Sequence, residues 1–175
     1  MVDFEGYACF DPGVDSPLDE VSRKEARAHY DLFIGQRKER ISQLGALVAR
    51  DGISMDGDDE SILQLNGWFF QNVEPDSTGE YTLRPIWYSV VNDIAIYLCE
   101  ELIRRAPWLH WEFYTYGKKD ISYQRPVIMG FNVKNKRYNV DFDHMIGTYA
   151  HRVVRGKEDE RDFFMKIMKS ALDFA

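Results

Sequence analysis

The sequence has few of the residues from which recognisable catalytic and metal sites are built. Its 175 residues include two cysteines, Cys9 and Cys99, and four histidines. One cysteine lies in an irregular amino-terminal segment and the other in an apolar helix pattern, which indicates neither a disulfide framework nor paired metal ligands. Glycine-rich phosphate loops and the Gly-x-Ser-x-Gly pattern of a nucleophilic serine are missing as well. The sequence therefore nominates no enzyme class by motif and predicts no cofactor.

Positive charge and long apolar runs are also lacking. The 22 Lys and Arg residues are outnumbered by 29 Asp and Glu residues, which gives a formal net charge of −7 at pH 7. Nonspecific affinity for nucleic acid comes mainly from clustered Lys and Arg, so no nucleic-acid partner is expected. No signal-peptide pattern begins the sequence, and no stretch approaches the roughly 20 apolar residues of a membrane span. We expect a cytoplasmic protein with reduced thiols and no membrane partner.

Apolar residues are present in the amount that one hydrophobic core requires. They make up 45% of a chain whose length is ordinary for one domain. No repeat, low-complexity tract or linker divides the sequence, which predicts a single domain over residues 1–175. Residues 1–20 mix Gly, Pro and acidic residues with aromatic ones. We expect them to form an irregular arm that packs loosely on the rest of the domain.

The clearest structural pattern lies between Trp87 and Arg105. Apolar residues recur there at steps of three and four, at Trp87, Val90, Val91, Ile94, Leu98 and Leu102. Further apolar residues on the opposite side predict a helix that is covered on more than one side. Pro85 suits the first turn of this helix, and Pro107 cannot continue it.

Local signals predict four further helices before and after this one. Ser22 and Glu25 have the spacing of a capping box, and the helix that follows them is expected to end before Asp51. Acidic residues from Asp58 onward can cap a second, short helix. Apolar periodicity returns at residues 145–153 and 163–172, which predicts helices at the end of the chain.

Three segments after Pro107 favour strands. They are residues 111–116, which are rich in aromatic side chains, residues 126–131 and residues 138–142. The Asn- and Lys-rich segment between the last two suits a hairpin turn. We therefore predict an α+β fold with its helices packed on a small antiparallel sheet of about three strands.

Asp141, Asp143 and His144 form the densest group of candidate metal ligands. Two carboxylates and an imidazole at the end of a strand could hold a divalent cation. In the alternative interpretation Asp143 caps a helix that begins near His144, while Asp141 points outward from a strand. Both interpretations stay open on the sequence.

Asp93 and Glu100 are seven residues apart, so two helical turns bring them to nearly the same face. A buried pair of carboxylates could do acid-base chemistry. Alternatively, Glu100 forms an i, i+4 pair with Arg104 on a solvated stripe of the helix.

Aromatic residues make up 14% of the chain and suggest a binding surface. Such residues dominate the hot spots of protein interfaces, and those near loops or on an open sheet face are the better candidates. These candidates are Trp108, His110, Tyr114, Tyr116 and Tyr123. An acidic field could steer a basic partner, and its residues are Asp11, Asp15, Asp19, Glu20, Asp56, Asp58, Asp59 and Glu60.

The central third of the chain resembles a group of small bacterial proteins. The helix pattern contains Asp93-Ile-Ala-Ile-Tyr-Leu and Glu100, and it is followed by Trp111 and by Gln124-Arg125-Pro126-Val127-Ile128. With these residues the chain resembles small uncharacterised bacterial proteins, some of whose families resemble toxin-immunity proteins. The resemblance implies a protein-binding role and carries no catalytic motif.

These observations predict a non-enzymatic, cytoplasmic binding protein of the immunity type, whose partner is a basic toxin or another protein. One alternative is a metal-dependent hydrolase that uses Asp141, Asp143 and His144, with Asp93 or Glu100 as the base. Another is a structural or regulatory subunit whose exposed apolar surface is covered in an oligomer. The oligomeric state does not follow from the sequence.

Overall fold

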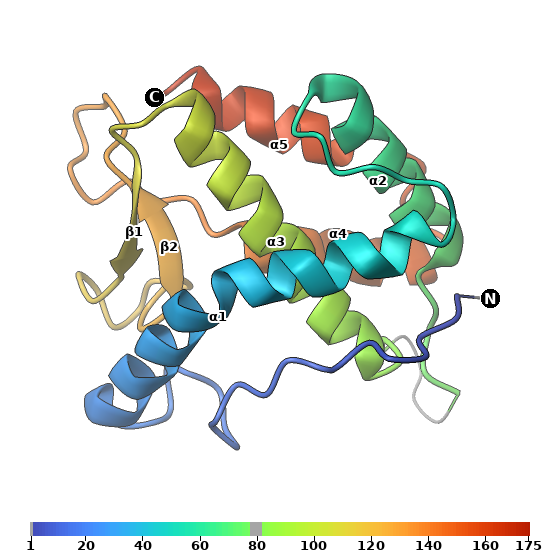
Figure 1. Ribbon diagram of the computed structural model, residues 1–175. Coiled ribbons are helices and arrows are strands. Elements are labelled where there is room, and N and C mark those ends of the chain that lie inside the picture. Colours follow the sequence, from blue (N-terminus) through green and yellow to red (C-terminus); the bar gives the residue numbers. More distant parts are fainter. Residues whose placement is uncertain (1, 78–81) are drawn as a thin grey trace.

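The computed structural model describes residues 2–77 and 82–175, and within them it contains five helices and a two-stranded antiparallel sheet (Figure 1). The helices are α1 (Arg23–Ala49), α2 (Asp59–Asn72), α3 (Ile86–Arg105), α4 (Phe142–Val154) and α5 (Phe163–Leu172), and the strands are β1 (His110–Phe113) and β2 (Pro126–Met129). The predicted α+β class is therefore confirmed. In the part of the chain that the structure describes, each helix is too short or too polar to cross a membrane.

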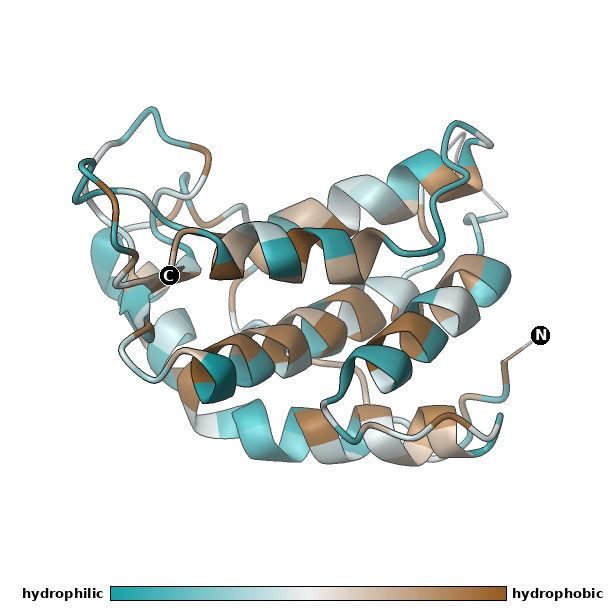
Figure 2. Cartoon of the chain, turned by 90° about the horizontal axis from the view of Figure 1, so that it is seen from above, coloured by the Kyte–Doolittle hydropathy of each residue, from teal (hydrophilic) through white to brown (hydrophobic). Residues whose placement is uncertain are grey.

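Helix α3 lies in the middle of the molecule. α1 packs on one side of it, and α4 and α5 pack on the other (Figure 1). Of its 20 residues, 13 are buried, and the hydrophobic colour in Figure 2 runs along almost its whole length. Since burying one large apolar side chain contributes about 1.5–3 kcal/mol, α3 is the main source of hydrophobic stabilisation. The prediction of a helix that is covered on more than one side is confirmed.

The predicted capping box begins α1. Ser22 Oγ accepts a hydrogen bond from the Glu25 amide at 3.3 Å, and Glu25 Oε2 accepts one from the Ser22 amide at 3.0 Å. At α2 the carboxylate of Asp58 accepts from the Ser61 amide at 2.7 Å, which makes Asp58 the N-cap. Both caps satisfy amides that have no partner inside the helix, so these two ends are fixed by local chemistry.

The sheet has two strands, and the prediction of about three strands is wrong. In β1 and β2, Trp111 is opposite Ile128, whereas the expected third strand makes only one bridge, between Val140 and Ile128. A turn ends at Tyr138, whose amide donates to the Asn135 carbonyl, and α4 starts directly after its N-cap at Asp141. Too few residues remain between turn and cap for a strand. The helices accordingly pack around α3 and not on a sheet.

The amino-terminal arm, residues 2–20, contains no helix or strand. It packs more closely than predicted, because Val2 and Tyr7 are buried and the Phe4 ring meets the edge of Trp87 at 5.4 Å between centroids. The guanidinium of Arg50 donates to the carbonyls of Asp3 and Glu5. The arm is thus part of the core.

A buried ion pair joins α1, α3 and the arm. Arg40 binds Asp93 with two hydrogen bonds of 2.8 and 2.6 Å, and the side chains are only 5% and 0% exposed. The Tyr7 hydroxyl donates to the same carboxylate, and Arg40 also donates to the Ala8 carbonyl at 2.7 Å. Burial raises the pKa of Asp93, and the hydrogen bonds from Arg40 and Tyr7 oppose this rise. Neither charge of such a pair tolerates the loss of the other.

We predict that Asp93→Asn lowers the free energy of unfolding by about 3–5 kcal/mol, because it leaves the Arg40 charge buried without a counter-charge. Urea denaturation followed by circular dichroism measures the loss. The matched control is Asp31→Asn, which breaks the exposed pair with Arg27 and should cost less than about 1 kcal/mol. If the two variants had the same free energy of unfolding, the buried pair would contribute no more to stability than the exposed pair does.

Candidate functional site

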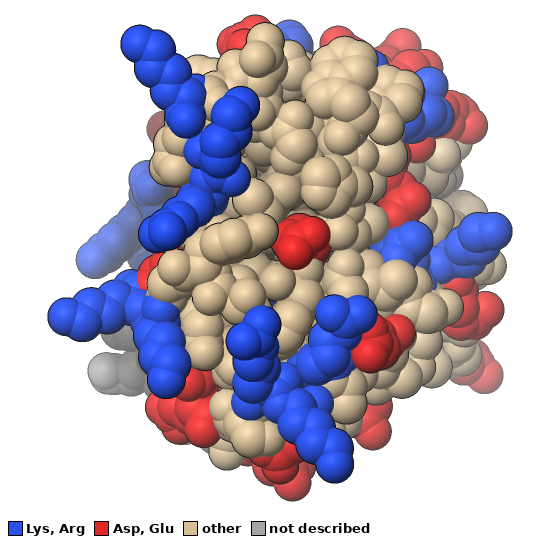
Figure 3. Space-filling model, turned by 90° about the vertical axis from the view of Figure 1, so that its left-hand side faces the viewer, with Lys and Arg blue, Asp and Glu red and all other residues tan. Residues whose placement is uncertain are grey.

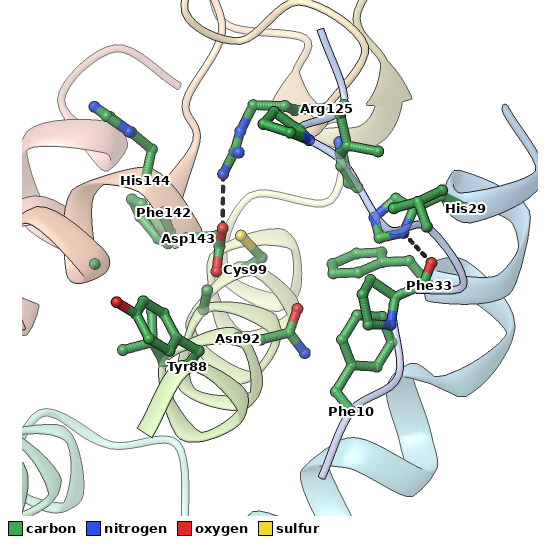
Figure 4. A pocket seen from close by; sticks show the side chains of 18 of the residues that line it. Phe10, His29, Phe33, Tyr88, Asn92, Cys99, Arg125, Phe142, Asp143 and His144 are labelled. Atoms are coloured by element: carbon green, nitrogen blue, oxygen red, sulfur yellow. Dashed lines mark hydrogen bonds and ion pairs between the residues drawn. The ribbon is translucent and has the colours of Figure 1, made fainter. Parts of the chain in front are cut away.

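A cavity of about 720 Å³ lies where the arm, α1, α3, α4 and the start of both strands meet (Figure 4). This volume is within the roughly 300–1,000 Å³ of small-molecule sites. Aromatic side chains from five different segments line it, namely Phe10 from the arm, Phe33 from α1, Tyr88 from α3, Trp111 from β1 and Phe142 from α4. The wall is therefore largely apolar, and no single segment builds it.

Arg125 and Asp143 line the cavity and form an ion-pair cluster with Asp141, which does not line it. Arg125 Nε lies 2.5 Å from Asp141 Oδ2, and Arg125 Nη2 lies 2.6 Å from Asp143 Oδ2. Asp141 also accepts from the His144 amide at 2.9 Å and is thereby the N-cap of α4. Two carboxylates share one guanidinium, so the cluster carries one net negative charge when both are ionised.

The two carboxylates of the cluster differ in access. The Asp141 side chain is 6% exposed, whereas that of Asp143 is 40% exposed, and the Asp143 carboxylate faces the cavity (Figure 4). Removal from bulk water raises the pKa of Asp143, the Arg125 guanidinium opposes the rise, and the negative charge of Asp141 adds to it. Asp143 is thus accessible to a ligand in the cavity although protein surrounds it.

Two other polar groups in the wall, Asn92 and His29, each have a hydrogen-bond partner in the protein. Asn92 donates to Asp93 Oδ1 at 3.2 Å, and its carbonyl oxygen points toward the cavity (Figure 4). His29 Nδ1 lies 2.7 Å from the Pro12 carbonyl, so that nitrogen carries a proton and donates it. Burial raises the pKa of the Cys99 thiol well above its usual value, which leaves it protonated and a poor nucleophile.

The three residues expected as metal ligands do not converge on a metal position. The Arg125 guanidinium pairs with both Asp141 and Asp143 where a cation would bind, and the His144 ring points away from Asp143 (Figure 4). Across residues 2–77 and 82–175, no group of three or more His, Cys, Asp or Glu side chains is suited to a metal ion. The alternative interpretation needs a correction too, because Asp141 and not Asp143 caps α4.

Asp93 and Glu100 lie on one face of α3, but each is bound to a different arginine of α1. Asp93 is fully buried with Arg40, so no substrate can reach it. Glu100 Oε1 lies 2.7 Å from Arg37 Nε and accepts at 2.7 Å from the indole of Trp111. The expected pair of Glu100 with Arg104 does not form, because Arg104 binds Glu101. The two carboxylates therefore do not make an acid-base pair.

The five aromatic or imidazole candidates for an interface differ in exposure. Trp108 and Tyr116 are 58% and 49% exposed, His110 is exposed, and Tyr123 is partly exposed. Tyr114 is only 2% exposed, and its hydroxyl donates to Asp120 at 3.0 Å. Tyr114 therefore stabilises the loop after β1 from inside and does not reach the surface.

Three residues of the cavity were not predicted as site residues: Arg125, Asn92 and Phe10. Phe10 and Arg125 are far apart in the sequence, and no periodic pattern links them. Asn92 lies within the apolar pattern of α3. The presence of two adjacent polar residues, Asn92 and Asp93, in such a pattern was a sign in the sequence that could have indicated a site. Comparison with protein-family models, curated proteins and solved structures finds no match.

We predict that Arg125→Gln destabilises the protein more at pH 7 than at pH 4. Without the guanidinium the pKa of Asp143 in the folded protein rises further. A carboxyl whose pKa is higher in the folded than in the unfolded protein costs stability when it has to ionise, so the loss grows as pH rises from 4 to 7. Because Asp143 is 40% exposed, the loss at pH 7 should be about 2 kcal/mol, below the 3–5 of a fully buried pair. Urea unfolding at both pH values tests this.

The control for this experiment is Arg84→Gln, which removes an exposed pair with Glu74. It should cost less than about 1 kcal/mol at either pH. A loss in Arg125→Gln that does not change between pH 4 and pH 7 would contradict the electrostatic role of Arg125.

Proposed function

We propose that the protein is a non-enzymatic binding module that recognises a protein partner through one end of the molecule. We define the sheet-end face as Trp108, His110, Tyr116, Ile121 and Tyr123, which belong to β1 and the loops on either side of it. The observation that carries the proposal is the exposure of large apolar side chains on this face. Among the described residues, the three most exposed large apolar side chains are Ile121, Trp108 and Tyr116, at 66%, 58% and 49%. Exposed aromatic side chains of this kind are enriched among interface hot spots.

The charge around the sheet-end face is opposite to that of the whole protein. Residues 110–140 contain five Lys and Arg residues besides the Arg125 of the cavity cluster, namely Lys118, Lys119, Lys134, Lys136 and Arg137, and only two acidic ones, Glu112 and Asp120. Figure 3 shows Lys and Arg side chains projecting beside a largely uncharged area at this end of the molecule. Since complementary charge steers association, the face favours an acidic partner.

This differs from the basic partner that the acidic residues suggested. Several of those residues are used within the protein: Asp56 accepts from Ser54, Asp58 caps α2 and Asp59 pairs with Arg105. They are also separate in sequence from the aromatic candidates. The partner class that we propose is therefore a protein with an acidic patch, and an acidic toxin surface would be the immunity-type case.

Trp108 is held on a rigid turn between α3 and β1. The adjacent Leu109 is 2% exposed, and its amide donates to the Ala106 carbonyl at 3.0 Å. Gly130 packs so closely that a Cβ on it would lie 2.7 Å from the Trp108 carbonyl, and its φ of +103° favours glycine. An aromatic side chain on a fixed backbone has less freedom to lose on binding, which suits an interface hot spot.

Three candidate catalytic groups are unavailable to a substrate, which also supports a binding role. Asp93 is inaccessible, Glu100 is paired with Arg37, and the Cys99 thiol is protonated. A protein that neutralises a toxin by covering it requires none of these groups. The resemblance to immunity proteins thus agrees with the proposal but does not carry it.

We predict that Trp108→Ala/Tyr116→Ala weakens partner binding about 100-fold or more, because each side chain is expected to be a hot spot. The partner is first captured by crosslinking the tagged protein in its native cells, and binding of the purified pair is then measured by titration calorimetry. Lys118→Glu/Lys119→Glu should slow association, most strongly at low salt.

The matched control is Leu32→Ala/Leu63→Ala, which removes two exposed apolar side chains from α1 and α2. It should change affinity less than about threefold, as expected for substitutions outside an interface. A partner that binds the Trp108/Tyr116 variant and the wild type equally would overturn the proposed face. Light scattering that shows only a stable homo-oligomer through this face would favour the structural-subunit alternative instead.

A further inference from the structure

We infer that the 720 Å³ cavity is a binding site for a small organic amine, with the ammonium group beside Asp143 and the apolar body against the aromatic wall. The site is separate from the sheet-end face, none of whose residues lines the cavity. It is therefore a second binding activity and does not depend on the proposed protein partner.

Two polar side chains of the wall, Asp143 and Asn92, offer acceptor oxygens to a ligand. One oxygen of Asp143 accepts from Arg125, and the other is turned away from Arg125 into the cavity (Figure 4). The Asn92 carbonyl also points inward, since its amide group is bonded to Asp93 (Figure 4). A ligand that satisfies these oxygens has to donate hydrogen bonds, and an ammonium group has donors only.

The charge of the wall has the sign that an amine requires. The Asp, Glu, Lys and Arg side chains of the wall are Asp15, Asp143 and Arg125. The Arg125 charge is shared between Asp143 and the buried Asp141, which leaves the cluster one negative charge in excess. A bound anion would face this excess, whereas a cation would neutralise it.

The aromatic wall is held in place before any ligand binds. The Phe33 ring meets Phe10 and Trp111 edge-on, at centroid distances of 6.3 and 5.2 Å. Trp111 is fixed by its hydrogen bond to Glu100, and the Phe10 amide donates to Ser89 Oγ at 2.9 Å. Aromatic faces attract cations and cover apolar groups, so such a wall suits an amine that carries an aryl or alkyl body.

The test compares three probes with the same apolar body: 4-phenylbutylamine, 4-phenylbutanol and 4-phenylbutyrate. Titration calorimetry on the full chain should show the amine binding at least about tenfold more tightly than the alcohol, and the carboxylate most weakly. Asp143→Asn keeps the size of the side chain, removes its charge and should abolish this preference. Asp31→Asn, on the exposed side of α1, should leave it unchanged.

A second variant tests the cavity itself. Gly147 lies on α4 in the wall, and a Cβ there meets only Val91 Cγ1, at 3.9 Å. Gly147→Leu places a good helix former at this position, so the fold should persist while the cavity fills. Binding of the amine should be lost, whereas Gly35→Leu, at an exposed glycine of α1 with open space around it, should retain it.

Several results would overturn the inference. They are an amine that binds no more tightly than the alcohol, a preference that survives Asp143→Asn, and amine binding that survives Gly147→Leu. Thermal unfolding of each variant shows whether it is folded. If Asp143→Asn were unfolded, the comparison of the three probes on the wild type together with Gly147→Leu would still decide between the outcomes.

Discussion

The charged pair of Arg40 and Asp93 is the interaction on which the rest of the structure depends. Asp93 lies in the most apolar helix of the chain, and an isolated carboxylate there would cost several kcal/mol. Burial of α3 therefore requires α1 to be present with its guanidinium, and the Tyr7 hydroxyl completes the bonding. The same guanidinium fixes Ala8 in the arm, two residues before Phe10 enters the cavity. Arg40 therefore stabilises both the core, through Asp93, and the part of the arm that lines the cavity, through Ala8.

Polar links at its edges explain why the cavity stays open. Apolar interiors normally pack to crystal-like density, so an unsupported gap of this size would collapse. Here Arg125 fixes the start of α4 to the chain entering β2, and Arg37 with Trp111 fixes α3 to α1 and β1 through Glu100. The hydrogen bonds of Arg125 and Trp111 are directional and lose energy when the walls approach one another, and the Arg37–Glu100 ion pair adds to them. The cavity is therefore a consequence of how the walls are anchored.

The helices were predictable because their signals are local, and the site was not because its partners are distant in sequence. The capping box of Ser22 and the cap at Asp58 fix their ends within three residues. The third strand was mistaken because Asp141 acts as a cap, a role that strand propensity does not report. Periodicity placed Asp93 and Glu100 on one face of α3 correctly. It could not show that Arg40, 53 residues away, neutralises Asp93.

Net charge misled for a related physical reason, since it averages regions of opposite sign. The chain carries −7 in total, the segment around the sheet-end face is basic, and the Arg125 cluster is negative. β1 separates the last two: Trp111 lines the cavity, and its neighbour His110 belongs to the sheet-end face. One site could influence the other only if β1 had two arrangements that a ligand distinguished. The ladder to β2 and the close approach of Gly130 to Trp108 hold β1 in one arrangement, so the two sites should bind independently.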